Sequence, residues 1–108
     1  IDIQISLDEE TIWLNESEIA LVFECSRKTI NYHLNKLLGD KKTYGRCCQD
    51  FCQVLPDGRK YIIKNFNLEI IELLSYKVRS KRVSTFLSNI NNIISQNKGV
   101  NKYYEQRL

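Results

Sequence analysis

The sequence predicts an α+β fold, and three features of its 108 residues lead to that prediction. Residues 1–7 alternate between apolar and polar side chains, which is the pattern of a half-buried β-strand. Residues 15–38 contain two short amphipathic helical patterns joined by a tight turn. Residues 51–64 form two extended runs on either side of a Pro-Asp-Gly turn, which is typical of a β-hairpin. We expect one domain over residues 1–108, because this length suits a single modest core.

The first strand is expected to form a hairpin with the apolar run at residues 11–14. Its apolar face carries the alternate residues Ile1, Ile3, Ile5 and Leu7. Acidic residues 8–10 separate the two runs. Trp13, in the second run, is expected to anchor the core rather than to bind a ligand, because a large aromatic ring buries much apolar surface.

The first helix of the pair has a well-defined start. Asn15 is the expected N-cap, and Glu18 completes a capping box three residues later. The buried stripe is expected to contain Ile19, Val22 and Phe23, and Ala20 is the small residue at which the second helix is expected to cross closely. Glu24 then occupies a turn position that is often glycine with positive φ. Because another residue in that conformation costs about 1–2 kcal/mol, we expect a slightly different turn here.

The second helix has an apolar face and a polar, basic face. Ser26 is its expected N-cap. Its core positions are Ile30, Leu34, Leu37 and Leu38, and its opposite face carries Arg27, Lys28, Asn31, Tyr32 and Asn35. Cations in a first helical turn oppose the helix dipole, and a bound phosphate would reverse that penalty. Two carboxamides one turn apart can read adenine in a major groove, and a tyrosine can contact the backbone. The pattern therefore predicts a helix-turn-helix that binds double-stranded DNA; the alternative is a solvated helix face.

The charge distribution favours a polyanionic partner. Residues 1–24 contain seven acidic residues and no lysine or arginine, so all 16 basic residues follow them. Such asymmetry within a net charge of +3 is a known indication of nucleic-acid contact. No apolar run approaches the length of a membrane span, so we expect a cytoplasmic, nucleoid-associated protein. Because the sequence contains no methionine, we also expect a fragment of a longer chain.

The hairpin after the helix pair makes the predicted domain winged-helix-like. In such domains the hairpin, or wing, meets the minor groove or the DNA backbone. Arg59 and Lys60 lie beside the turn and are the expected contacts, although a solvated hairpin tip is an equal alternative. The polar segment at residues 39–46 is expected to be an irregular connection.

Two C-terminal helices complete the predicted fold. The first is expected to bury Leu68, Ile70, Ile71, Leu74 and Val78. The second carries Val83, Phe86, Leu87, Ile90, Ile93 and Ile94 on one stripe and is expected to end at Gly99. This stripe belongs by default in the core. It is also a possible homodimer seam, and the alternative function is therefore a protein–protein interaction or dimerisation module without nucleic-acid binding. A basic cluster between the helices, made of Lys77, Arg79, Lys81 and Arg82, either contacts phosphates or is solvated.

The sequence favours neither a metal site nor an enzyme. Cys47, Cys48 and Cys52 cluster, but they lack the two separated pairs of a structural zinc site. His33, the single histidine, is expected to pack rather than to act. With no glycine-rich phosphate loop and no nucleophile motif, we expect no catalytic residues and no cofactor.

The chain also resembles a known family. The matching residues are TIWL at 11–14, then Ala20, Phe23, Ser26, Arg27, Thr29, Ile30, His33 and Leu34, and the block NFNLEIIELLSYKVRSKRVSTF at 65–86. Together they resemble the N-terminal region of the RhuM family of virulence-associated bacterial proteins over nearly the whole chain. The resemblance implies a DNA-binding protein carried on mobile elements and a role in transcription regulation. Ser75 stands where the family commonly has glycine, and Asn89 where it has tryptophan.

Overall fold

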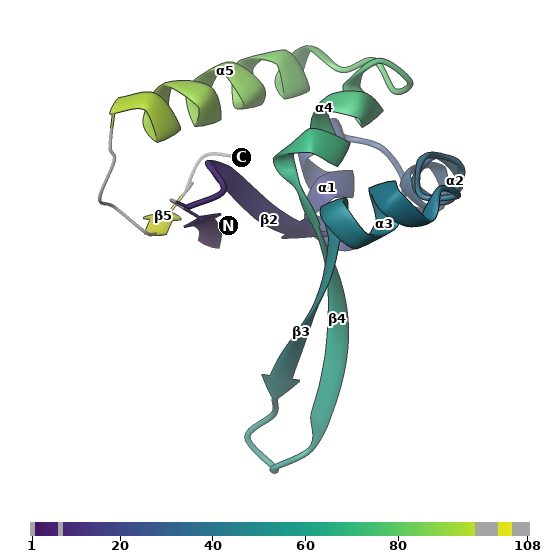
Figure 1. Ribbon diagram of the computed structural model, residues 1–108, viewed down its shortest axis with the longest axis vertical. Coiled ribbons are helices and arrows are strands. Elements are labelled where there is room, and N and C mark those ends of the chain that lie inside the picture. The colour runs from purple at the N-terminus through teal and green to yellow at the C-terminus, as the bar shows by residue number, and fades with distance from the viewer. Residues whose placement is uncertain (1, 7, 97–101, 105–108) are drawn as a thin grey trace.

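The computed structural model describes residues 2–6, 8–96 and 102–104, and its ribbon is drawn in Figure 1. The elements follow in the order β1 (Asp2–Ser6), β2 (Thr11–Asn15), α1 (Glu16–Phe23), α2 (Arg27–Leu37), α3 (Lys41–Cys47), β3 (Cys48–Val54), β4 (Lys60–Asn67), α4 (Leu68–Ser75), α5 (Lys81–Gln96) and β5 (Lys102–Tyr104). The predicted α+β class is confirmed. The expectations for Ile1, Leu7 and Gly99 lie outside the described residues.

The strands form one antiparallel sheet in the order β3-β4-β2-β1-β5. The predicted hairpins are both present, as β1 with β2 and as β3 with β4. The sheet continues between them because Leu14 of β2 pairs with Phe66 of β4. The short strand β5 was not predicted; three residues are too few to show a periodic pattern. Figure 1 shows the β3–β4 hairpin extending well beyond the rest of the molecule.

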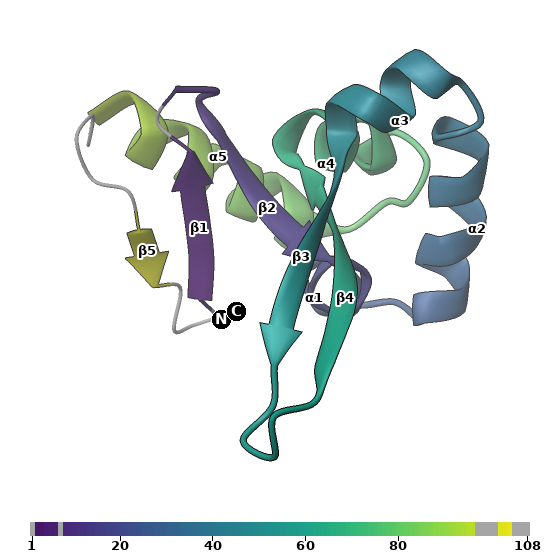
Figure 2. The same cartoon turned by 60° about the horizontal axis from the view of Figure 1, so that its bottom comes forward.

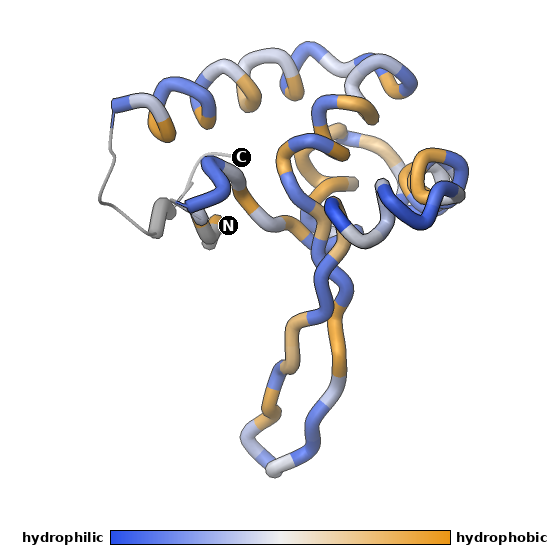
Figure 3. Tube along the Cα trace, viewed as in Figure 1, coloured by the Kyte–Doolittle hydropathy of each residue, from blue (hydrophilic) through white to orange (hydrophobic). Residues whose placement is uncertain are grey.

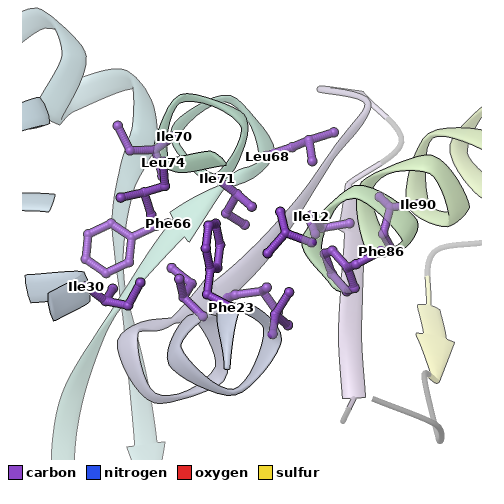
Figure 4. Close-up of a cluster of buried hydrophobic side chains, with 14 of the residues drawn as sticks. Ile12, Phe23, Ile30, Phe66, Leu68, Ile70, Ile71, Leu74, Phe86 and Ile90 are labelled. Atoms are coloured by element: carbon purple, nitrogen blue, oxygen red, sulfur yellow. The ribbon is translucent and has the colours of Figure 1, made fainter. Parts of the chain in front are cut away.

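The core lies between the sheet and the helices. Figure 4 shows Phe23 of α1 pointing toward Ile71 of α4, while Phe86 of α5 lies close to Ile12 of β2. All four of these side chains are almost completely buried. Trp13 is also buried, and its ring centroid lies 6.0 Å from that of Phe51. Its predicted burial is confirmed, but it lies outside the main core cluster, which contains its neighbours Ile12 and Leu14.

The two helices of the predicted pair begin where the sequence indicates. The N–H of Glu18 donates to Oδ1 of Asn15 over 2.9 Å, and the N–H of Asn15 donates to Oε1 of Glu18 over 2.9 Å. The capping box is therefore complete. At the start of α2 the N–H of Thr29 donates to Oγ of Ser26 over 3.1 Å. Both N-cap predictions are confirmed.

The expected change in the turn between α1 and α2 is wrong. Glu24 adopts φ 55° and ψ 43°, the left-handed conformation that a glycine usually supplies at this position. The N–H of Cys25 donates to the carbonyl oxygen of Ala20 over 3.1 Å, which satisfies a group at the end of α1. The turn is kept because α1 and α2 must both reach the same core, and that requirement overrides the preference of one residue.

The expected irregular connection at residues 39–46 is also wrong. Residues Lys41–Cys47 form α3, whose N-cap Asp40 accepts a hydrogen bond from the hydroxyl of Thr43 over 3.1 Å. Cys47 is its one buried residue, so the segment carries no apolar stripe that a sequence pattern would reveal. Tertiary contacts hold it instead: Nη2 of Arg46 lies 2.6 Å from Oε2 of Glu69 on α4.

The C-terminal helices direct their apolar side chains inward. Figure 3 shows the hydrophobic positions of α5 on the side that faces the rest of the molecule. Val83, Phe86 and Ile90 are buried, and Leu87, Ile93 and Ile94 pack against the same core while remaining partly exposed. The helix α4 ends at Ser75, so Val78 lies beyond the helix that was expected to carry it, although it also packs on the core. None of the described helices is long and apolar enough to cross a membrane.

The left-handed turn residue gives the first test. We expect Glu24→Gly to raise the free energy of unfolding by about 0.5–1 kcal/mol, because it removes the Cβ penalty but adds freedom to the unfolded chain. Urea unfolding measures the change. Glu24→Gln is the matched control, since it removes the same charge and keeps the Cβ. Equal stabilisation by the two variants would show that charge, and not backbone conformation, limits the turn.

Candidate nucleic-acid interface

A hollow of about 710 Å³ lies between α2 and β4. Its walls include Arg27, Asn31 and Asn35 from α2, Tyr61 and Lys64 from β4, Glu16 from α1 and Tyr44 from α3. Leu34 and Phe66, which belong to the core, also line it. We call this hollow the α2–β4 groove. Figure 2 shows the two elements that flank it, with the hairpin extending past the start of α2.

The predicted polar face of α2 is exposed. Some of its residues line the α2–β4 groove, and the others lie outside the groove. Arg27, Asn31 and Asn35 line the α2–β4 groove. Lys28 and Tyr32 are exposed outside its lining. The helix therefore presents its two carboxamides on the side of the hairpin.

Tyr32 is held by its neighbours on α2. Nζ of Lys36 lies 4.7 Å from the centroid of the Tyr32 ring, a cation–π distance. The ring of His33 meets that of Tyr32 edge-on, with the centroids 5.1 Å apart. His33 is half-buried, and this ring contact gives it a packing role.

A chain of polar contacts joins α1 to the exposed face of α2. Nδ2 of Asn31 donates to Oε2 of Glu16 over 3.0 Å. Nδ2 of Asn35 in turn donates to Oδ1 of Asn31 over 3.1 Å. Nε of Arg27 lies 3.5 Å from Oε1 of Glu16. We call this set the Glu16 network. The sequence analysis missed Glu16, because its partners are set by the crossing of two helices and no local pattern reveals them.

Lys64 and Tyr44 close the hairpin side of the groove. Nζ of Lys64 donates to the hydroxyl oxygen of Tyr44 over 2.8 Å. This hydrogen bond raises the pKa of Lys64. The alternation along β4 places Lys60, Ile62 and Lys64 on one face, a signal that the sequence contained. Tyr44 was missed because its segment was not recognised as a helix.

The predicted wing residues lie at the far end of the hairpin and outside the groove lining. Gly58 has φ 88°, as the turn requires. Nε of Arg59 donates to Oδ2 of Asp57 over 2.6 Å, so an exposed ion pair offsets much of its charge. Lys60 is exposed. The structure thus separates these cations from Arg27, Asn31 and Asn35.

A second hollow, of about 800 Å³, lies beside the turn between α1 and α2. Arg27 borders both this hollow and the α2–β4 groove, and Arg82 of the predicted basic cluster also lines this hollow. The exposed side chain of Leu21 also contributes. The start of α2 therefore stands between two recesses.

The four cysteines are free thiols in different surroundings. Cys47 is buried, Cys25 and Cys48 are half-buried, and Cys52 is exposed on β3. Burial raises the pKa of the thiols of Cys25, Cys47 and Cys48. Within the described part of the chain, no group of three or more His, Cys, Asp and Glu side chains is placed to hold a metal ion.

Comparisons with protein-family models, with curated proteins and with solved structures find no match to this chain. The resemblance to the RhuM family therefore stays a prediction from the residues alone.

The thiol environments give the second test. We expect Cys52 to react first with a soluble disulfide reagent, because the thiolate is the attacking species and this side chain is exposed. Cys47 should react only on unfolding, since burial hides it and raises its pKa. The number of thiols labelled over time measures both. Cys52→Ser should remove the fast phase and nothing else; a fast phase that survives would place another thiol at the surface.

Proposed function

We propose that this chain is a winged-helix-like protein that binds double-stranded DNA sequence-specifically through α2. One observation carries the proposal: Arg27, Asn31 and Asn35 form an exposed polar row on a helix that stands beside a projecting hairpin. Arginine suits phosphate and carboxamides suit base edges, so this row combines affinity with readout. Duplex DNA accommodates an α-helix of this kind in its major groove.

The order of the elements supports the winged-helix part of the proposal. The strand β2 precedes the helix pair α1 and α2, the hairpin β3–β4 follows it, and β2 lies beside β4 in the sheet. In this proposal the β3–β4 hairpin is the wing, and α2 is the second helix of the helix-turn-helix. The additional helix α3 between α2 and the hairpin is a local feature of this chain.

In this proposal each side of the α2–β4 groove has its own role. Asn35 reads a base edge in the major groove, since its Oδ1 and its second amide hydrogen complement adenine N6 and N7. Lys28, Tyr32 and Asn31 extend the contact surface of α2. On the hairpin, Lys60 and Lys64 meet phosphates, and Arg59 exchanges its exposed partner Asp57 for a phosphate near the tip.

We further propose a role in transcription regulation of the RhuM type, in a protein carried by bacterial mobile elements. The support is the residue pattern at 11–14, 20–34 and 65–86. The proposal assigns no catalytic residue and no cofactor, because α2 and the hairpin act by binding alone.

The alternative, a dimerisation or protein-interaction module that uses α5, has less support. Three of its six stripe residues, Val83, Phe86 and Ile90, are buried in the core of the same chain. Only the partly exposed Leu87, Ile93 and Ile94 would remain for a partner. A DNA-binding protein of this kind can still form a homodimer through that remainder, and this stays a prediction.

Base readout by α2 gives the third test. We expect Asn35→Ala to weaken binding to a selected duplex by about 1–3 kcal/mol and binding to random duplex far less. Fluorescence anisotropy on both duplexes measures the difference. Asn91→Ala, an exposed asparagine on α5, is the matched control and should change neither. Equal losses on both duplexes would make Asn35 a backbone contact.

The hairpin lysines give the fourth test. We expect the double variant Lys60→Ala and Lys64→Ala to flatten the dependence of log affinity on log salt by nearly two units, about 0.9 for each phosphate that a lysine no longer neutralises. The control removes two lysines from α3, with Lys41→Ala and Lys42→Ala, which lie outside the groove lining. An unchanged slope in the hairpin variant would remove the hairpin from the interface.

A further inference from the structure

We infer that Glu16 is a positioning residue that fixes the carboxamides of Asn31 and Asn35 for base readout; this inference rests on the proposed DNA binding. A carboxylate repels the phosphates of DNA, so an acidic side chain on a DNA-binding surface needs a specific role. Glu16 lines the α2–β4 groove together with Arg27, Asn31 and Asn35. Its side chain is only 22% exposed, so it is part of the groove wall rather than a freely moving surface group.

The hydrogen bonds give the three residues different roles. Glu16 is fixed at the start of α1 and accepts from Nδ2 of Asn31 over 3.0 Å. Asn31 uses its Oδ1 to accept from Asn35 over 3.1 Å, so its amide is engaged on both sides. Asn31 is therefore a relay, and Asn35 is the end of the chain.

Asn35 keeps the groups that a base requires. A carboxamide has two donor hydrogens and an acceptor oxygen, and Asn35 uses one hydrogen on Asn31. Its Oδ1 and its other amide hydrogen have no hydrogen bond within the described part of the chain. These two groups form the acceptor–donor pair that matches an adenine edge. The bond to Asn31 fixes the plane in which they lie.

Preorganisation is the benefit of this arrangement. An exposed side chain that must be immobilised on binding lowers affinity by about two- to tenfold. A chain of bonds anchored on Glu16 orders both asparagines before DNA arrives. A carboxylate that accepts from an amide also gives a stronger hydrogen bond than a neutral acceptor does.

The carboxylate also restrains nonspecific binding. Arg27, whose side chain is 67% exposed, lies with its Nε 3.5 Å from Oε1 of Glu16. While this pair holds, the guanidinium is less available to a phosphate of any sequence. Glu16 therefore has two effects: it orders the readout groups, which favours the selected site, and it weakens the sequence-independent attraction of Arg27 to any duplex.

The experiment compares the parent with Glu16→Ala and Glu16→Gln on a duplex that the parent selects from a random-sequence pool, and on random duplex. We expect Glu16→Ala to reduce the affinity ratio between the two by about fivefold or more, because two side chains lose their order. Glu16→Gln should retain most of the ratio, because its Oε1 can still accept from Asn31. Both variants should steepen the salt dependence by up to about one unit, since Arg27 becomes free to bind a phosphate.

The matched control is Glu72→Gln, which changes the net charge equally on α4, outside the α2–β4 groove. It should leave both the ratio and the salt dependence at parent values. Thermal unfolding of each variant reports whether the loss of an acid at the start of α1 has unfolded the chain, and Glu16→Gln provides the folded comparison if alanine is not tolerated.

Two results would overturn the inference while leaving the proposed function intact. One is a parent that selects its site and a folded Glu16→Ala variant with the same affinity ratio. The other is a Glu16→Gln variant that loses as much of the ratio as alanine does, because the hydrogen bond would then have no part in it. A parent that retains no duplex, or that shows no preference among duplexes, would instead overturn the proposed function.

Discussion

The arrangement of this protein depends on the pairing of β2 with β4. These strands are about fifty residues apart in the chain, yet Leu14 lies opposite Phe66 and both are buried. A slip of one residue would turn Phe66 to the other face of the sheet, so the hydrophobic pattern fixes the register. Asn15, at the end of β2, pairs with Asn65 and also caps α1. The same few residues therefore position the hairpin and start the helix pair, which is why a groove exists between α2 and β4.

The turn between the helices shows how the core decides between competing preferences. The left-handed conformation of Glu24 costs about 1–2 kcal/mol. Burying one side chain such as Phe23 or Ile30 contributes about 1.5–3 kcal/mol, and both depend on the angle at which the helices cross. The packing term is larger, so the strained residue is tolerated. The conformational preference of Glu24 by itself is the smaller of the two terms.

Acidic and basic residues that are separated along the sequence lie close together in the folded structure. Glu16 belongs to the acidic first segment, yet it lies in the groove among residues of the basic remainder. Arg27 offsets the charge of Glu16, and Nδ2 of Asn31 donates a hydrogen bond to Oε2 of Glu16. Similarly, Arg46 of α3 pairs with Glu69 of α4 and lowers the pKa of that carboxyl. Such pairs connect elements that the sequence keeps apart, and they determine which surface cations remain available.

The parts of this fold that were predictable are those encoded within a few residues. Periodicity located the β1–β2 hairpin and the α4 and α5 helices, a Pro-Asp-Gly turn located the β3–β4 hairpin, and side-chain caps located the starts of α1 and α2. The exposed face of α2 followed from the same periodicity. The helix α3 was not predictable, because only Cys47 is buried in it and its remaining support comes from Glu69 and Asn67 across the fold.

By itself, the sequence determined which side chains of α2 face outward and which belong to the core. Side chains of a helix repeat at a fixed angle, and the apolar ones are buried away from water. Only the tertiary structure decided what those outward side chains meet. The closure of β2 on β4 brings Lys64 and Tyr44 to one side of α2, and the crossing of α1 brings Glu16 to its start. Contacts between distant segments depend on the final packing of every element, and no local pattern records them.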